Sequence, residues 1–210
     1  MGRLANNIGG STPLEEPLEG LLMSNINTVE DLNCAEHANI TKATAYYFLD
    51  IKNLTNFKLN LDNLYKVHKQ MFDEVWKWAG VKRNKETAPV GVPVFKIDEE
   101  LKKLVDDYSY WIKHATYKPI EIAARLHYKS VFIQPFKNGN GRWSRLVGMI
   151  VFYQLTKTYL IWPSDLNKET PFRKDYLNAL HEADSGNFKS MVVLHEKICR
   201  ESLTEKLYKK

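Results

Sequence analysis

The sequence is poor in the residues and runs that mark several large classes of protein. It has two cysteines, Cys34 and Cys199, among 210 residues, too few for a disulfide framework or a thiolate-only metal site. Its 10 glycines and 8 prolines exclude a collagen-like or low-complexity chain. The longest apolar stretch, at 146–155, is broken by Gly148 and Gln154 and is too short to span a bilayer.

The chain also lacks a large excess of either sign of charge. It has 30 Lys and Arg and 25 Asp and Glu, which gives a net charge of +5. The basic residues are spread along the chain, so we expect no nucleic-acid partner and no membrane surface. No apolar run of signal-peptide length lies in the first twenty residues, so we expect a cytoplasmic protein with two buried, reduced thiols. A hydrophobic fraction of 44% is enough for a sizeable core.

Hydrophobic periodicity predicts a mostly α fold. Residues 1–27 lack a sustained period and read as an N-terminal tail, a candidate regulatory segment, whereas 28–210 read as one helical domain. The expected helices cover residues 28–47, 61–80, 98–112, 119–133, 141–157, 171–183 and 188–207. Residues 82–97 differ, because β-branched residues alternate with Gly and Pro, as in a short β-hairpin or flap.

The segment before the helix at 141–157 combines features of an anion site. Gly139, Asn140 and Gly141 can place successive N–H groups around an anion, at the positive end of the following helix dipole. Arg142 and Arg145 are three residues apart, so both guanidinium groups project from the same side of the first turn. A solvated helix start with a glycine cap is the alternative, but two arginines beside the amides favour a polyphosphate.

Residues 134–145, QPFKNGNGRWSR, resemble the signature of the Fic (Fido) family, His-Pro-Phe-x-(Asp/Glu/Asn)-Gly-Asn-Gly-Arg-x-x-Arg. The similarity extends over roughly residues 28–195. It implies a Fic-type helical domain with a small β-hairpin flap, in which the signature loop joins two central helices. Relatives of this kind transfer AMP from ATP to a protein hydroxyl with the help of Mg²⁺, so the resemblance implies a protein adenylyltransferase that binds ATP and Mg²⁺.

The resemblance also implies roles for single residues. Asn138 stands where the family usually places an Mg²⁺-binding acid, and its neutral amide is a weaker ligand for that ion. Gly139–Gly141 would cradle the phosphates, and Arg142 and Arg145 would hold their β/γ end. The flap would dock the protein target as an added strand. Its expected docking residues are Val90, Gly91, Val92, Val94 and Phe95.

The departure from the signature is Gln134, which occupies the position of the family's catalytic histidine. An amide cannot take the proton of the target hydroxyl, and loss of a general base costs about 10²–10⁴-fold in rate. The chain is then a natural pseudoenzyme that still binds nucleotide, an engineered inactive variant, or an enzyme of altered chemistry. His127 is the candidate for a replacement base and is disfavoured, and His68 reads as a core histidine.

Other functions and modes of control stay open at this point. Glu19-Gly20 fits the end of the family's inhibitory motif, (Ser/Thr)-x-x-x-Glu-(Gly/Asn), but Glu15 stands where Ser or Thr is needed. An acidic linker is therefore favoured over a Glu19–Arg145 clamp, and a separate small antitoxin remains an alternative. The rival to an adenylyltransferase is a non-catalytic binding module or toxin–antitoxin component. A kinase-like use of the site, as in Doc toxins, is less favoured, and the oligomeric state is open.

Overall fold

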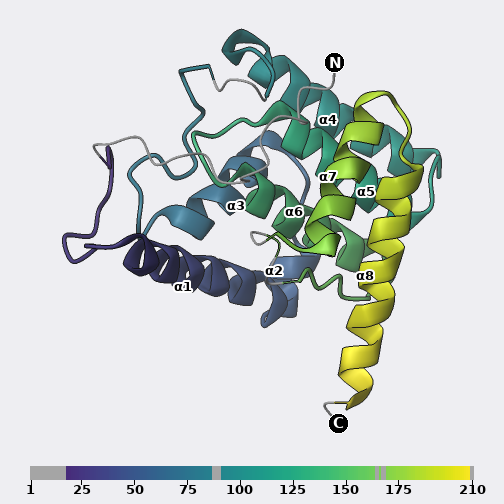
Figure 1. Ribbon diagram of the computed structural model, residues 1–210. Coiled ribbons are helices and arrows are strands. Elements are labelled where there is room, and N and C mark those ends of the chain that lie inside the picture. Colours follow the sequence, from purple (N-terminus) through teal and green to yellow (C-terminus); the bar gives the residue numbers. More distant parts are fainter. Residues whose placement is uncertain (1–17, 87–90, 164–165, 167–168, 209–210) are drawn as a thin grey trace.

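The computed structural model describes residues 18–86, 91–163, 166 and 169–208, with side chains described as far as residue 202. In this part of the chain it forms a helical domain (Figure 1). The elements, in chain order, are α1 (Val29–Phe48), α2 (Ile51–Thr55), α3 (Leu61–Phe72), the short 3₁₀ helix η1 (Val94–Lys96), α4 (Ile97–Lys113), α5 (Pro119–Ile133), α6 (Asn140–Thr156), α7 (Pro171–Asp184) and α8 (Lys189–Tyr208). The predicted mostly α class is confirmed.

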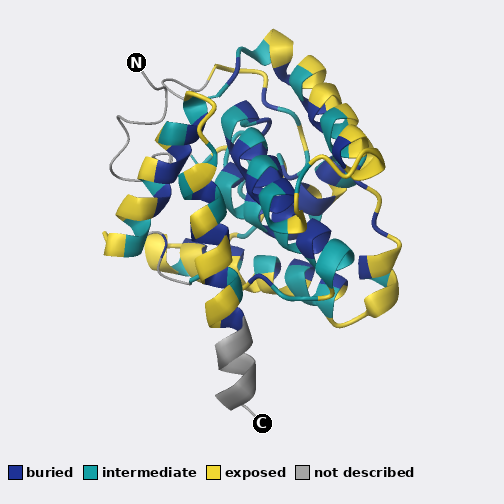
Figure 2. Cartoon of the chain, turned by 90° about the vertical axis from the view of Figure 1, so that its right-hand side faces the viewer, coloured by how far each residue is buried: buried dark blue, intermediate teal, exposed yellow. Residues whose placement is uncertain are grey.

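Helices α5 and α6 form the centre of the domain, and they make the most extensive helix–helix contact in it. One hydrophobic cluster joins this pair to α1, α2, α3 and α4, and a second joins it to α7 and α8. Figure 2 shows the same arrangement, with buried segments in the middle of the molecule and exposed surface on the outer helices. The loop between α5 and α6, which carries the signature, therefore starts and ends in the best-packed part of the fold.

Local sequence signals set several helix boundaries. The Thr28 hydroxyl accepts the N–H of Asp31 at 3.0 Å, and the Asp31 carboxylate accepts the N–H of Thr28 at 2.9 Å. This capping box starts α1 at the predicted position. Pro119 occupies the first position of α5, where its fixed φ suits a helix start and its missing N–H needs no partner.

The predicted helix at 61–80 is wrong over its second half, because α3 ends at Phe72. Long-range contacts explain the early end. The amide side chain of Asn39 in α1 accepts the N–H of Glu74 at 3.0 Å, and Trp76 forms a β-bridge with Leu21. These bonds satisfy backbone groups that a continued helix would have paired internally. The short helix α2 lies in a region where no helix was predicted.

The small β-hairpin flap is not confirmed. Val90 lies outside the described residues, and the following Val94–Lys96 form the 3₁₀ helix η1. Across the described part of the chain, β-pairing amounts to two isolated bridges, Leu21 with Trp76 and Lys82 with Phe136. The helix expected at 98–112 begins at Ile97, and its N-cap is Lys96.

Part of the predicted N-terminal tail is bound to the domain. The N–H of Leu22 donates to the carbonyl of Val75 at 2.9 Å, and the N–H of Lys77 donates to the carbonyl of Gly20 at 2.8 Å. Residues 18–27 therefore pack against the turn after α3, whereas residues 1–17 lie outside the described residues.

The two thiols differ in their surroundings. Cys34 is exposed on α1, so its predicted burial is wrong, and Cys199 is half-buried on α8. Cys34 stands off the inner stripe of α1, which is formed by Leu32, Glu36 and Asn39. In the described ranges, none of the helices combines the length and apolar character that crossing a bilayer requires.

Candidate functional site

The signature loop leaves α5 at Gln134 and enters α6 at Asn140, and two left-handed residues shape it. Gln134 has φ 48° and ψ 65°, and Gly139 has φ 77°. Between them Phe136 is buried, and Asn140 closes the loop on it. The Asn140 side chain accepts the N–H of Phe136 at 3.0 Å and donates to its carbonyl at 2.8 Å. One N–H and the oxygen of this amide are bonded to Phe136, so the Asn140 side chain closes the loop, and its backbone N–H lies at the start of α6.

His68 of α3 contacts the signature loop through a hydrogen bond and a ring stack. Its Nδ1 accepts the N–H of Gly80 at 2.9 Å, so the proton of a neutral ring sits on Nε2 and is donated to the carbonyl of Asn138 at 3.0 Å. The ring also stacks on Phe136, with centroids 3.6 Å apart. Burial, with a smaller effect of the positive charge of Arg142, lowers the pKa of His68 to about 3, although the bond to Asn138 acts in the opposite direction. The prediction of a core histidine is confirmed.

Gly139 can be replaced by no other residue without strain. A Cβ at this position would lie 2.5 Å from Cζ of Phe72, and the φ of 77° already disfavours side chains. We expect Gly139→Ala to lower the free energy of unfolding by about 2–4 kcal/mol, from overpacking and backbone strain together. Gly141→Ala is the matched control, because its Cβ would meet only Nη1 of Arg145 at 3.6 Å. Urea denaturation measures both, and equal midpoints would contradict the expectation.

The first turn of α6 presents free backbone donors. Gly139 is the N-cap and has no side chain to accept the N–H groups of Asn140, Gly141 and Arg142. These groups have no acceptor within the helix, and the helix dipole places partial positive charge there. An anion is the natural partner of such a helix start when arginines stand beside it.

Arg142 is bound to a buried carboxylate that the sequence did not reveal. Its Nη1 lies 2.5 Å from Oε2 of Glu36, and Oε1 of Glu36 accepts the indole N–H of Trp76 at 2.7 Å. Glu36 is 5% exposed, although it is charged. Its place on the inner stripe of α1, between Leu32 and Ala43, is the signal that could have identified it. The guanidinium of Arg142 is therefore fixed in place, and its charge is partly compensated.

Arg145 has a different environment. It forms a hydrogen bond with the hydroxyl of Tyr176, and its guanidinium carbon lies 5.9 Å from the ring of Trp162. Burial lowers the pKa of Arg145, and so do the charges of Arg142 and Arg173, but a guanidinium with this starting value stays protonated. In the part of the chain that is described, neither Arg145 nor Arg173 forms an ion pair with a carboxylate. Among the described residues, the positive charge at Arg145 therefore has no carboxylate as a counterion.

Neither Gln134 nor His127 can serve as the base at position 134. Gln134 is half-buried, and its side chain is a neutral amide. His127 lies inside the core, where its Nε2 is 3.2 Å from the hydroxyl of Tyr176 and its Nδ1 is 3.4 Å from Nε2 of His195. Burial, with the charges of His195 and Arg145, holds the pKa of His127 well below its usual value. A buried, weakly basic ring cannot replace the missing histidine.

The residues at the loop fit a magnesium ion poorly. The side-chain oxygen of Asn138 accepts the N–H of Gly139 at 2.6 Å, so it has one lone pair left for a metal. Within the described ranges, no three His, Cys, Asp or Glu side chains are grouped so that they could bind a metal ion. Phosphate oxygens and water would have to supply most of the coordination.

The residues expected to dock a target or to inhibit the site form contacts with residues other than Arg142 and Arg145. Glu19 lies 3.5 Å from Nζ of Lys137 in the signature loop rather than at Arg145. Within the flap, Val92 is buried and Phe95 is 80% exposed. The N–H of Val94 donates to Glu86 at 3.0 Å, so part of the flap backbone is already paired. The remaining glycine of the flap, Gly91, adopts a left-handed φ of 94°.

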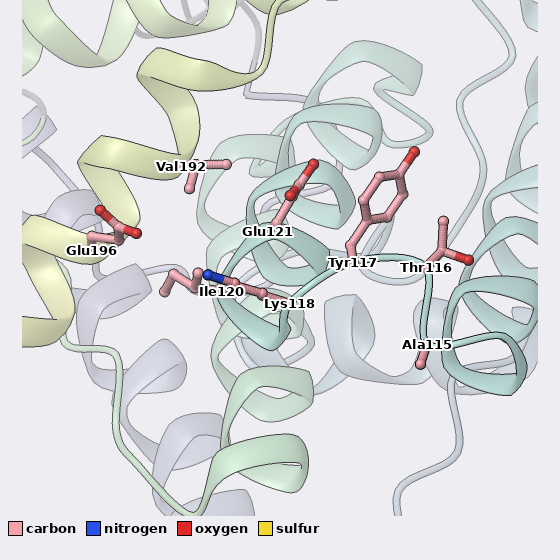
Figure 3. A pocket seen from close by; sticks show the side chains of 8 residues that line it. All are labelled: Ala115, Thr116, Tyr117, Lys118, Ile120, Glu121, Val192 and Glu196. Atoms are coloured by element: carbon pink, nitrogen blue, oxygen red, sulfur yellow. The ribbon is translucent and has the colours of Figure 1, made fainter.

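A cavity of about 460 Å³ lies away from the signature loop, between the turn joining α4 to α5 and helix α8 (Figure 3). Its lining residues are Ala115, Thr116, Tyr117, Lys118, Ile120, Glu121, Val192 and Glu196. One of its two carboxylates, Glu121, is already paired with Arg125 at 2.8 Å. No residue of the signature contributes to this cavity.

Comparison with known proteins agrees with this geometry. The model of the Fic/DOC family matches residues 58–152, from the approach to α3 to near the end of α6. Residues 58–152 therefore match the Fic/DOC family, and the resemblance of the signature segment to that family is confirmed.

Curated relatives of the chain carry the name protein adenylyltransferase. The chain is 34% identical over 97 residues to protein adenylyltransferase fic-1 of Caenorhabditis elegans, a match that covers 45% of this chain and 17% of the relative. It is 25% identical over 138 residues to protein adenylyltransferase Fic of Nematostella vectensis, covering 64% and 31%. The chain thus spans less than a third of the length of these relatives.

Solved structures show the same fold. A Fic-1 fragment from C. elegans superimposes with a TM-score of 0.70 at 22% identity, covering 89% of this chain and 54% of that one. The BepC protein of Bartonella tribocorum, solved with bound AMPPNP, superimposes with a TM-score of 0.61 at 19% identity, covering 82% and 88%.

Proposed function

We propose that this chain binds ATP at the start of α6 and is a protein adenylyltransferase scaffold whose base catalysis is impaired. The observation that carries the proposal is the cationic helix start. Backbone N–H groups of Asn140–Arg142 lie at this helix start, and the guanidinium of Arg145, which has no carboxylate partner among the described residues, lies beside Gly141. The relatives named adenylyltransferase and the neighbour solved with AMPPNP support a nucleoside triphosphate as the anion.

In the proposed reaction, the hydroxyl oxygen of a protein side chain attacks the α-phosphorus of ATP. The bond between the α-phosphorus and the bridging oxygen breaks, and pyrophosphate leaves from the cationic helix start. The chain's own residues orient the phosphates and stabilise the charge that develops on the leaving group. The hydroxyl proton has no side-chain acceptor at Gln134, so its transfer to water limits the rate.

Arg145 is the residue whose removal tests binding most directly. Arg142 is less suitable, because its loss would leave the buried carboxylate of Glu36 without its cation. For the unchanged chain, ATP with Mg²⁺ at about 100 times its dissociation constant should stabilise the folded state by about 2.7 kcal/mol. For a domain of this size, that is a rise in Tm of about 5–10 °C. We expect Arg145→Ala to abolish this rise in Tm, because it removes a guanidinium that has no carboxylate partner among the described residues.

Thermal melts with and without millimolar ATP measure this effect. Arg125→Ala is the control, since Arg125 is paired with Glu121 on α5 and lies outside the signature loop. The control should keep the full shift. A wild-type melting curve that ATP leaves unchanged would refute nucleotide binding.

The second candidate is a binding module without transfer activity, and the observation that favours it is Gln134 itself. Both candidates bind nucleotide, so binding alone cannot separate them. Transfer of label from the α-phosphate of ATP to protein indicates the adenylyltransferase. Transfer from the γ-phosphate would indicate a kinase-like reaction, and bound but untransferred nucleotide would indicate the module.

A further inference from the structure

Arg83 is a buried arginine that no sequence motif identifies. It follows the turn at Gly80 and is 5% exposed. Its guanidinium donates to three backbone carbonyls: Nε to Gln134 at 2.6 Å, Nη1 to Lys85 at 3.0 Å, and Nη2 to Val92. The carbonyl of Gln134 belongs to the first residue of the signature, and the carbonyl of Val92 belongs to the flap.

The backbone around Arg83 joins the same segments. Its own N–H donates to the carbonyl of Pro135 at 2.9 Å, next to the bridge between Lys82 and Phe136. The N–H of Val92 lies 3.4 Å from the carbonyl of Ile133, at the end of α5. Three segments therefore meet at the Arg83 side chain: the turn at 80–86, the described part of the flap from residue 91 onward, and the signature loop.

The carbonyls that Arg83 binds need a charged donor of this shape. Gln134 is held in the left-handed region, which is unfavourable for a residue with a side chain, so its conformation depends on the bonds around it. A guanidinium offers five N–H donors in one plane and can reach three acceptors at once. Among the described residues, its carboxylate neighbour is Glu86, which is 3.7 Å away and largely exposed, so the carbonyls are its principal partners there.

We propose that Arg83 is a positioning residue that fixes the backbone at position 134 and couples the flap to the nucleotide-binding loop. The bond to Gln134 sets the direction in which the side chain of residue 134 leaves the loop. The bond to the Val92 carbonyl holds the part of the flap that follows residue 90 against the same guanidinium. The part of the inference that concerns nucleotide affinity rests on the proposed function.

The experiment compares Arg83→Met and Arg83→Lys with Arg125→Met in the full chain. Arg125 is the matched control, because its guanidinium lies 4.0 Å from the ring of Tyr117 and 4.2 Å from that of Phe188 and is also paired. Hydrogen exchange followed by mass spectrometry is measured for peptides covering 91–97 and 133–143. ATP affinity is measured by calorimetry.

We expect Arg83→Met to speed exchange in both peptides about tenfold or more and to weaken ATP binding about tenfold, while peptides from α7 and α8 keep their rates. Arg83→Lys should have smaller effects, because one ammonium group can serve fewer carbonyls. Arg125→Met should leave both peptides and the ATP affinity unchanged. If Arg83→Met does not fold, the same comparison is made with Arg83→Lys.

Several results would overturn the inference. They are exchange that rises equally throughout the molecule, exchange that rises in only one of the two peptides, and an ATP affinity that stays within twofold of wild type. If the unchanged chain binds no ATP, the proposed function fails, and the exchange rates still decide whether Arg83 couples the two segments.

Discussion

Replacing Gln134 with histidine is expected to raise AMP transfer by about 10²–10⁴-fold, the usual contribution of a general base. The loop already holds the phosphates in our proposal, so proton transfer from the target hydroxyl is the step that lacks a group. An imidazole titrates near neutral pH and can accept this proton, whereas a glutamine amide cannot. The backbone at residue 134 is fixed by Arg83 and Ser130 rather than by the Gln134 side chain, so the substitution should not disturb the loop.

The measurement is transfer of label from the α-phosphate of ATP, to the chain itself and to added proteins. Gln134→Asn is the matched control, because it keeps an amide and should show no gain. Melting curves with ATP check that both variants still bind nucleotide. If Gln134→His binds ATP as the unchanged chain does and transfers no label, the adenylyltransferase reading is wrong and the binding module gains support.

The sequence was sufficient where local rules decide the structure. The capping box at Thr28 and the proline at position 119 placed two helix starts, and the glycine-containing segment 134–141 placed the loop between the central helices. These features depend on residues that are close together in the chain. The position of the signature loop between two helices follows from them.

The sequence was insufficient where contacts between distant residues decide. Nothing near Glu36 indicates that its partner is Arg142, 106 positions away, and the three carbonyls bound by Arg83 belong to separate segments. The end of α3 was missed for the same reason, because the bond from Asn39 that competes with a longer helix comes from α1. Patterns of polarity identify which face of a helix is buried, but not which polar groups meet there.

The pH dependence of stability should be steep on the acid side, because three histidines are buried in neutral form. Burial lowers the pKa of His68 to about 3 and that of His195 to about 4, and His127 lies well below its usual value. All three bind a proton near pH 6.5 in the unfolded chain. The unfolded state therefore holds more protons than the folded state below pH 6.5, and stability falls as the pH drops through that range toward the folded-state pKa values.

The expected loss is about 1.2 kcal/mol for each buried histidine between pH 7 and pH 5.5, or about 3–4 kcal/mol in all. Above pH 7 the free energy of unfolding should change little from this cause. Urea denaturation at a series of pH values measures it, and His195→Gln should remove about a third of the loss. His114→Gln is the control, because His114 is exposed and its removal should leave the profile as it is. A flat profile from pH 7 to pH 5.5 would show that these rings are protonated in the folded protein. The bond from Nε2 of His68 to the loop would then belong to an imidazolium, and the account of a neutral ring beneath the anion site would be wrong.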